Sequence, residues 1–262
     1  MAGPDEEILT GLEDGIFTVV FNRPQARNAL TFAMYERLAN ICTEINDDDR
    51  VKALVITGAG EKAFAAGTDI SQFRAFSTAQ DALDYEARID RVLGLIEACR
   101  VPTIAAIGGA CTGGGAGIAL ACDLRIATGN ARFGFPIART LGNCLSMSNY
   151  ARLASLIGPG RTKEIIFTAR LVEAEEAKSI GMISEILADH AALATRTEAL
   201  ARLVASHAPL TLRATKEALR RLKERSFEGM DKDLILMCYM SADFREGMDA
   251  FLTKRSPVWT GR

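Results

Sequence analysis

Three consecutive glycines, Gly113 to Gly115, constrain the fold of this chain more than any other feature. They follow an apolar run at residues 103–107 and precede another at residues 118–122. The pattern predicts a strand, a tight turn and a helix. Glycine N–H groups can approach a ligand closely, and the positive end of a helix dipole lies at the same point. The turn is therefore a candidate site for an oxygen that gains negative charge, although a simple packing turn fits the glycines equally well.

Missing motifs and the bulk properties of the chain exclude several classes of function. No Lys-Ser/Thr pair follows the glycines and no acidic ribose ligand follows the next strand, so a nucleotide-phosphate loop is not expected. The 262 residues are 48% hydrophobic and 24% charged, enough for one globular core with a modest appendage. A net charge of −2 gives no indication of nucleic acid or an anionic membrane as partner. A small-molecule partner is expected.

The six cysteines form no C-x-x-C pair and lie mostly in apolar or helical patterns, which favours reduced, buried thiols and a cytoplasmic location. Residues 1–7 are acidic and lack the features of a targeting signal, and no apolar run approaches the length of a membrane span. No cluster of Cys, His and carboxylates has metal-ligand spacing, so we expect no metal site.

Apolar periodicity predicts alternating strands and helices. Strands are expected at residues 16–21, 51–57, 103–107, 124–127 and 183–187. Helices are expected after Thr31, at residues 82–98 and, beyond Arg161, at 162–168, 173–180, 191–206 and 211–223, with Pro209 separating the last two. The run at 51–57 is too continuously apolar for a one-sided sheet. A layered α/β core follows from this order of elements.

Four motifs, in order along nearly the whole chain, resemble the crotonase (enoyl-CoA hydratase/isomerase) superfamily. They are Asn-Arg-Pro-Gln-Ala-Arg-Asn-Ala-Leu at 22–30, Phe-Ala-Ala-Gly-Thr-Asp-Ile at 64–70, the triple glycine, and the tail at 246–255. The resemblance implies an α/β fold in which a spiral of ββα turns forms an acyl-CoA-binding core at residues 1–195. A C-terminal helical oligomerisation region at residues 196–262 is implied as well, with a homotrimer or a dimer of trimers as the assembly.

The resemblance also implies the ligand and its contacts. An acyl-CoA thioester of fatty acid metabolism would bind, and no cofactor beyond its CoA moiety would be needed. The backbone N–H groups of Thr68 and Gly114 would form an oxyanion hole for the thioester carbonyl. Contacts to CoA are carried over by motif to Arg27, Ala65, Ala66, Asp69, Ile70 and Lys254. Arg27 and Lys254 could instead be ordinary surface residues, and Asp69 could bond only to its own turn.

The sequence departs from the superfamily where acid–base catalysis is expected. Typical hydratases place one glutamate two residues after the triple glycine and another just after Phe-Gly-x-Pro, and these positions are Gly117 and Ile137 here. No Asp or Glu occurs from Leu124 through Lys163. Polar candidates for the pocket are Arg139, Asn143 and Ser146. Without a G-x-S-x-G elbow, covalent catalysis by Ser146 or Cys144 is not expected.

These features predict an enzyme that stabilises a thioester enolate but lacks the usual hydratase glutamate pair. One alternative is a decarboxylase-like reaction, in which loss of CO2 creates the enolate and Arg139 holds a substrate carboxylate. Another is a non-catalytic acyl-CoA-binding or assembly protein. Because syn addition of water needs an acid and a base, hydration should be poor unless a carboxylate comes from the helix near residues 81–90 or from a neighbouring subunit.

Overall fold

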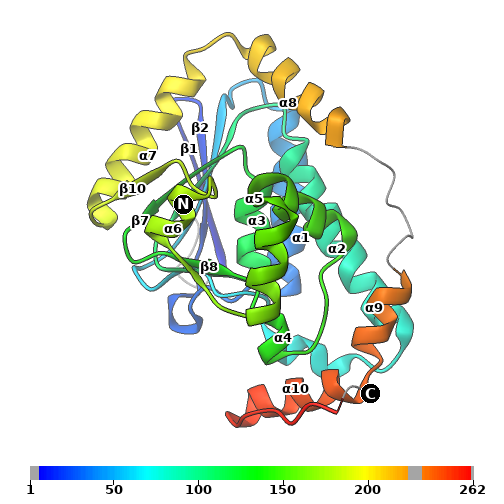
Figure 1. The fold of residues 1–262 in the computed structure, drawn as a ribbon. Helices are drawn as coiled ribbons and strands as arrows, with labels where there is room; N and C mark the ends of the chain where they lie inside the picture. Colours follow the sequence, from blue (N-terminus) through cyan, green and yellow to red (C-terminus); the bar gives the residue numbers. More distant parts are fainter. Residues whose placement is uncertain (1–5, 224–231, 261–262) are drawn as a thin grey trace.

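Two β-sheets lie at the centre of the computed structural model, which describes residues 6–223 and 232–260 (Figure 1). The larger sheet has the strand order β1-β2-β3-β5-β7-β10, antiparallel between β1 and β2 and parallel elsewhere. The smaller sheet has the order β4-β6-β8-β9. The strands are β1 (Ile8–Glu13), β2 (Ile16–Phe21), β3 (Ala53–Gly58), β4 (Ala63–Ala65), β5 (Thr103–Ile107), β6 (Ala110–Thr112), β7 (Leu124–Thr128), β8 (Arg132–Gly134), β9 (Val172–Glu173) and β10 (Glu185–Leu187).

The chain winds through both sheets as a repeated ββα turn. Strands β3, β5 and β7 each enter the larger sheet, and the strand that follows each of them, β4, β6 or β8, enters the smaller one. A helix then returns the chain for the next turn. The helices are α1 (Phe32–Asn46), α2 (Ala79–Glu97), α3 (Gly114–Ala121), α4 (Ile137–Thr140), α5 (Met147–Thr168), α6 (Ala174–Ser179), α7 (His190–Ala205), α8 (Pro209–Lys223), α9 (Lys232–Tyr239) and α10 (Ala242–Thr253), with short 3-10 helices η1 (Pro24–Ala26) and η2 (Ile70–Ala75). This is the predicted spiral.

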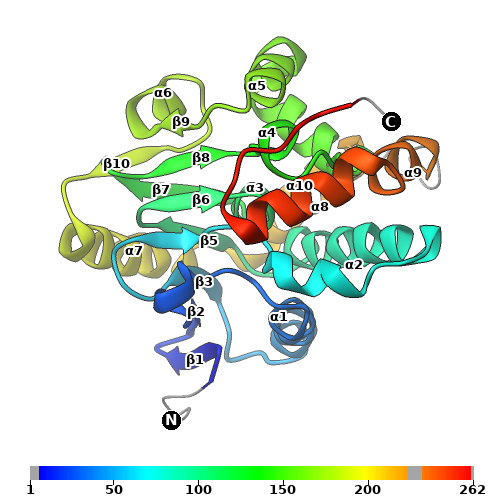
Figure 2. The ribbon, with the colours of Figure 1, turned by 90° about the horizontal axis from the view of Figure 1, so that it is seen from below.

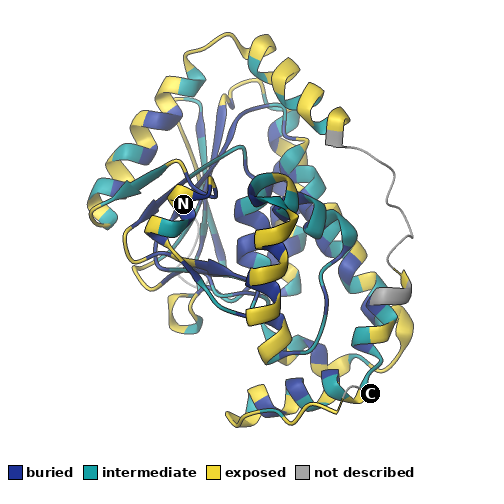
Figure 3. Ribbon diagram, viewed as in Figure 1, coloured by how far each residue is buried: buried dark blue, intermediate teal, exposed yellow. Residues whose placement is uncertain are grey.

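Both faces of the larger sheet are covered, as the continuous apolar runs predict. Helix α7 packs on one face, where Val55 and Ile104 meet Leu193 and Leu200. Helices α1, α2, α3 and α5 lie on the other side (Figure 1). Because strand side chains alternate, the neighbouring strand residues, such as Leu54, enter the main core on that opposite face. Buried residues line the interior of both layers, and exposed ones lie on the outer helix faces (Figure 3).

The C-terminal helices fold back over one end of the molecule: α9 packs against α2, and α10 contacts η2 and α4 (Figure 2). Tyr239 of α9 and Phe244 of α10 join a separate apolar cluster with Phe73 of η2 and Leu141. This cluster closes one end of the molecule, next to the strand ends of the smaller sheet. The C-terminal segment thus supplies part of the wall of the region described below.

Most predicted elements are confirmed, including the Thr31 N-cap, whose hydroxyl accepts a hydrogen bond from the Met34 amide. The helix expected at 162–168 is part of the longer α5, which bends at Gly158 (φ 81°), and Pro209 begins α8 rather than only preceding it. The strands of the smaller sheet are not among the predicted elements, because each has only two or three residues. Strand β1 is also not predicted, because Gly11 and Glu13 interrupt its apolar pattern. The boundary predicted between residues 195 and 196 falls inside α7 and stays a prediction, with its outer limits, residues 1 and 262, outside the described residues.

All six cysteines are free thiols, and five of them are buried. Within residues 6–223 and 232–260, no helix has the length and apolar character needed to cross a membrane. The acidic start at residues 1–5 lies outside the described part of the chain.

Candidate functional site

Three chain turns meet because three neighbouring strands of the smaller sheet end at the same edge. Strands β4 and β6 pair in parallel, with Ala65 opposite Cys111, and β6 pairs in parallel with β8, with Thr112 opposite Gly134. The carboxyl ends of parallel strands lie together. The turn after β4, residues 66–68, therefore lies beside the glycine turn after β6, with the segment after β8 on its far side.

The glycines of these turns are required by conformation and by contact. Gly67 has φ 104° and Gly113 has φ 52°, and residues with side chains rarely adopt such positive φ values. A Cβ atom on Gly113 would lie 3.3 Å from Gly67 Cα, and one on Gly115 would lie 2.3 Å from the Ala65 carbonyl oxygen. The two turns consequently pack backbone against backbone, which confirms the packing explanation of the triple glycine and leaves the binding explanation as a prediction.

Two backbone N–H groups are left unpaired where these turns meet. The bridge between Leu30 and Thr68 uses the Gly67 carbonyl and the Asp69 amide, not the Thr68 amide. Gly114 is the first residue of α3, so its amide has no acceptor within the helix. Among the described residues, neither amide has a hydrogen-bond acceptor. The site thus offers two adjacent donors together with a helix N-terminus.

The Thr68 side chain is held by two tyrosines. Its hydroxyl lies 2.9 Å from the Tyr35 hydroxyl and 2.8 Å from the Tyr85 hydroxyl. Burial raises the pKa of both phenols, so each stays protonated and can take part in this chain of hydrogen bonds. Thr68 is consequently fixed from α1 and α2 while its backbone N–H stays open.

A cavity of about 530 Å³ extends from these turns into the interior. Residues from the strand ends, α2, α4 and the segment 143–149 line it, and Phe251 of α10 lies at its border. Seven of the predicted residues line it: Thr68, Gly114, Arg27, Ala66, Asp69, Ile70 and Asn143. A larger hollow of about 700 Å³ lies between β1, β2 and α7, but no predicted site residue lines it. The smaller cavity is therefore the candidate site.

The residues carried over for CoA contact have different surroundings. Arg27 is exposed at the cavity border, and its left-handed backbone (φ 51°) ends η1. Ala65 is fully buried in β4 and does not line the cavity, although its carbonyl contacts Gly115. Lys254 is exposed at the end of α10, outside the lining.

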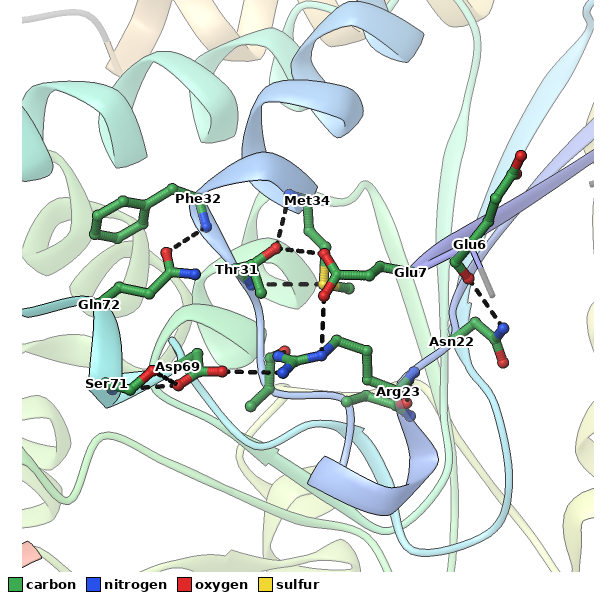
Figure 4. A network of polar contacts seen from close by, with 12 residues as sticks. Glu6, Glu7, Asn22, Arg23, Thr31, Phe32, Met34, Asp69, Ser71 and Gln72 are labelled. Atoms are coloured by element: carbon green, nitrogen blue, oxygen red, sulfur yellow. Dashed lines mark hydrogen bonds and ion pairs between the residues drawn. The ribbon is translucent and has the colours of Figure 1, made fainter. Parts of the chain in front are cut away.

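Asp69 bonds to its own turn, as one of the two sequence interpretations expects, and also to Arg23, which neither interpretation included. Its carboxylate accepts hydrogen bonds from the Ser71 hydroxyl (2.7 Å) and from Arg23 (3.0 Å), and Figure 4 shows it directed toward both. Partial burial acts to raise the pKa of Asp69, but the hydrogen bonds from Ser71 and Arg23 outweigh it and lower the pKa. Arg23 also contacts Glu7 at 3.1 Å. Asp69 is thus a positioned anion at the rim, already neutralised by its neighbours.

Of the three polar pocket candidates, only Asn143 lines the cavity. Arg139 is exposed on the short helix α4, because its position on that helix directs it away from the cavity side formed by Ile137 and Thr140. Ser146 is buried, but it caps α5 and donates a 2.7 Å hydrogen bond to Asp90. The prediction that Arg139 and Ser146 belong to the pocket is therefore not supported.

A buried carboxylate that sequence reasoning did not single out also lines the cavity. Glu86 of α2 is 5% exposed and lies on the same helix face as Ile89 and Leu93, both of which line the cavity. The helical spacing of Glu86, Ile89 and Leu93 is the sequence signal that could have identified Glu86, because an acidic residue on an apolar helix face is buried together with that face. Gly117 and Ile137, which replace the usual glutamates, line the same cavity.

Comparisons with known proteins identify the family of the chain and the fold that it shares with solved structures. The family model described as enoyl-CoA hydratase/isomerase matches residues 11–262. A crotonyl-CoA hydratase of Syntrophomonas wolfei is 35% identical and aligns over 95% of this chain and 96% of its own. An enoyl-CoA hydratase structure from Bacillus anthracis (32% identity, TM-score 0.78) covers 98% of this chain and is itself covered fully. A methylmalonyl-CoA decarboxylase bound to 2-nitronate-propionyl-CoA (26% identity, TM-score 0.86) covers 98% of this chain, with 99% of its own covered.

The fold and the paired turns define an acyl-CoA enzyme with the crotonase architecture. The chain belongs to the enoyl-CoA hydratase/isomerase family.

Proposed function

We propose that this enzyme binds an acyl-CoA thioester and stabilises its enolate with the backbone N–H groups of Thr68 and Gly114. The observation that carries the proposal is the pair of unpaired amides at the mouth of one cavity. Preorganised donors of this kind stabilise an oxygen that becomes negative, and loss of one donor typically costs about 3 kcal/mol in activation free energy. Asn143 provides a polar side chain in the same cavity, and Arg27 and the backbone at residues 66–70 provide the CoA contacts.

The proposed reaction is enolate chemistry without the standard hydration step. Relatives of this chain are named hydratases, but positions 117 and 137 of this chain provide no acid or base. A decarboxylase-like reaction is the second candidate, supported by the TM-score of 0.86 to methylmalonyl-CoA decarboxylase. Arg139 is exposed and does not line the cavity, so it is not placed to hold a substrate carboxylate. Proton transfer on an uncharged acyl group therefore fits the cavity better.

Calorimetric titration with acetoacetyl-CoA tests the proposal at its first step. We expect micromolar affinity, because the cavity, the amide pair and an exposed cation at Arg27 all suit a CoA thioester. Arg27→Ala should weaken binding by about 1 kcal/mol, or fivefold, as expected for an exposed charge pair with phosphate. The same variant should bind an acyl-pantetheine, which lacks the nucleotide phosphates, as wild type does. Failure of every acyl-CoA in a broad panel to bind would refute the proposal, and binding without turnover would favour the assembly-protein alternative.

We also propose a homotrimer or a dimer of trimers. Helix α8 leaves Leu210, Leu219 and Leu222 exposed at 76%, 62% and 82%, and such apolar side chains on one terminal helix suit burial against a neighbouring subunit. Light scattering at working concentration should give three or six times the 28.2 kDa chain mass. A monomer mass would contradict this proposal.

A further inference from the structure

The cavity contains one buried carboxylate that the proposed function leaves unassigned. Glu86 lies in the middle of α2, where a residue facing the core would ordinarily be apolar. Burying a carboxyl group is unfavourable unless it is hydrogen-bonded, so its retention on this face needs a reason. The other carboxylate lining the cavity is Asp69, which Arg23 and Ser71 already engage at the rim.

Side chains from two distant segments hold Glu86 in place. The Tyr239 hydroxyl of α9 donates to Glu86 Oε1 at 2.5 Å, across 153 residues of sequence. Asn143 Nδ2 in turn donates to the Tyr239 oxygen at 3.1 Å. Burial, and then the nearby Glu86 charge, raise the pKa of Tyr239, which keeps the phenol protonated as the donor. A short hydrogen bond to a carboxylate is strong and directional, so the orientation of Glu86 is fixed before any ligand enters.

The helix that carries Glu86 is also connected to the amide pair. Tyr85, the residue preceding Glu86, bonds to the Thr68 hydroxyl, and Thr68 provides one of the two open amides. Glu86, Thr68 and Gly114 all line the same cavity. A separate observation indicates that a ligand belongs here: the buried Asn143 Oδ1 has no hydrogen-bond partner among the described residues. A donor group on a bound molecule would satisfy it.

We propose that Glu86 is the proton-transfer group for this site, a role that rests on the proposed function. Glu86 takes a proton from the α-carbon or γ-carbon of the acyl group. The C–H electron pair shifts toward the thioester carbonyl, whose oxygen becomes the enolate oxygen held by Thr68 and Gly114. The protonated Glu86 then returns the proton to the α-carbon or the γ-carbon. No co-reactant is consumed, so the reaction class is α-proton exchange or a 1,3-shift of a double bond.

The alternative is that Glu86 only anchors α9 through Tyr239. The two roles differ in what the carboxylate must do. An anchor needs an acceptor oxygen, which glutamine also provides, whereas proton transfer needs a group that can carry the proton. Glu86→Gln therefore separates the roles with little change in shape.

The test of this role is the rate at which butyryl-CoA and but-3-enoyl-CoA incorporate deuterium in D2O, measured by mass spectrometry. The wild-type enzyme should exchange the α-protons or shift the double bond. Glu86→Gln should lower that rate about 10²–10⁴-fold, the usual contribution of a proton-transfer group, while calorimetric affinity for the thioester changes less than about threefold. The matched control is Asp84→Asn, the same chemical change at an exposed position of α2, which should leave the rate unchanged.

Two more variants keep the result interpretable. Glu86→Asp retains the carboxylate one methylene further back and should recover part of the rate that glutamine loses. Tyr239→Phe should lower kcat more than it raises KM, because Tyr239 positions the carboxylate rather than reacting. Wild-type rates in folded Glu86→Gln, or a wild-type enzyme that binds thioesters but exchanges none, would overturn the inference. Absence of any thioester binding would instead count against the proposed function.

Discussion

The two walls of the cavity consist of different groups: backbone amides form one wall, and side chains form the other. One wall consists of backbone: the turn at residues 66–68 and the glycine turn present amides, and their side chains matter mainly for packing. The other wall consists of side chains: Glu86 of α2 and Asn143 of the segment after α4 line the cavity, and Tyr239 of α9, outside the lining, bonds to both. In the proposed mechanism, the backbone wall would stabilise charge that forms on the substrate, and the side-chain wall would determine which proton moves.

This difference suggests which part of such a site tolerates sequence change and which part does not. Backbone amides do not depend on side-chain identity, so the first wall persists wherever the glycines and the strand pairing persist. The second wall can change by single substitutions, and here Gly117 and Ile137 occupy the positions of two acids while Glu86 approaches from another helix. Binding and enolate formation can thus be retained while the reaction that follows changes.

The largest effect expected from this difference between the walls is on the rate of crotonyl-CoA hydration. Addition of water needs an acid and a base, and each such group typically contributes about 10²–10⁴-fold. Glu86 and Asp69 are the carboxylates that line the described cavity, and Arg23 and Ser71 already engage Asp69, so at least one of these factors should be missing relative to an ordinary hydratase. Loss of the conjugated thioester absorbance measures the rate. Turnover equal to that of an ordinary hydratase would show that another acid, from this chain or a neighbouring subunit, completes the pair.

A gain-of-function variant sharpens the same prediction. Introducing Gly117→Glu together with Ile137→Glu should raise hydration, because both positions line the cavity. A Cβ at position 117 would lie 3.2 Å from the end of Leu93, a contact that a small side-chain movement relieves, and 3.8 Å from Asn149 Oδ1, an ordinary contact distance. The matched control, Gly117→Gln with Ile137→Gln, has the same shape and no acid. An equal rise in both double variants would mean that the carboxylates are not responsible.

The backbone wall can be predicted from the sequence because its signals are local. Gly67, Gly113 and the apolar strands before them lie within a few residues of the amides that they position. Strand pairing then brings the two turns together, and this pairing follows from the ββα order. Local patterns and motifs are therefore enough to indicate the fold, the turns and the pair Thr68 and Gly114.

The side-chain wall cannot be predicted in the same way because its contacts are long-range. Tyr239 and Glu86 are separated by 153 residues, and nothing local to either indicates the other. Ser146 and Arg139 lie in the segment that follows Phe-Gly-x-Pro, yet one caps α5 and the other is exposed. Helical spacing alone marks Glu86 as facing the core, although it does not indicate the partner of Glu86.

The backbone wall is tested by removing one donor, and the structure shows how this must be done. Gly114→Pro deletes the N–H, and proline suits the first position of a helix such as α3. Any Cβ at position 114, however, would lie 1.8 Å from the Tyr35 hydroxyl oxygen. The single variant would displace Tyr35 and its hydrogen bond to Thr68 as well as remove the amide. A loss of activity in that variant alone would have two causes.

A Tyr35→Phe background removes the clashing oxygen and makes the comparison interpretable, since Thr68 keeps its hydrogen bond to Tyr85. In that background Gly114→Ala adds the Cβ and keeps the N–H, whereas Gly114→Pro adds a side chain and deletes the donor. We expect the proline variant to exchange α-protons about 10²–10³-fold more slowly than the alanine variant, with much closer affinities for the ground-state thioester, because the donor acts chiefly on the developing enolate. Equal rates in the two variants would assign the glycine turn to packing alone and leave the side-chain wall to account for catalysis.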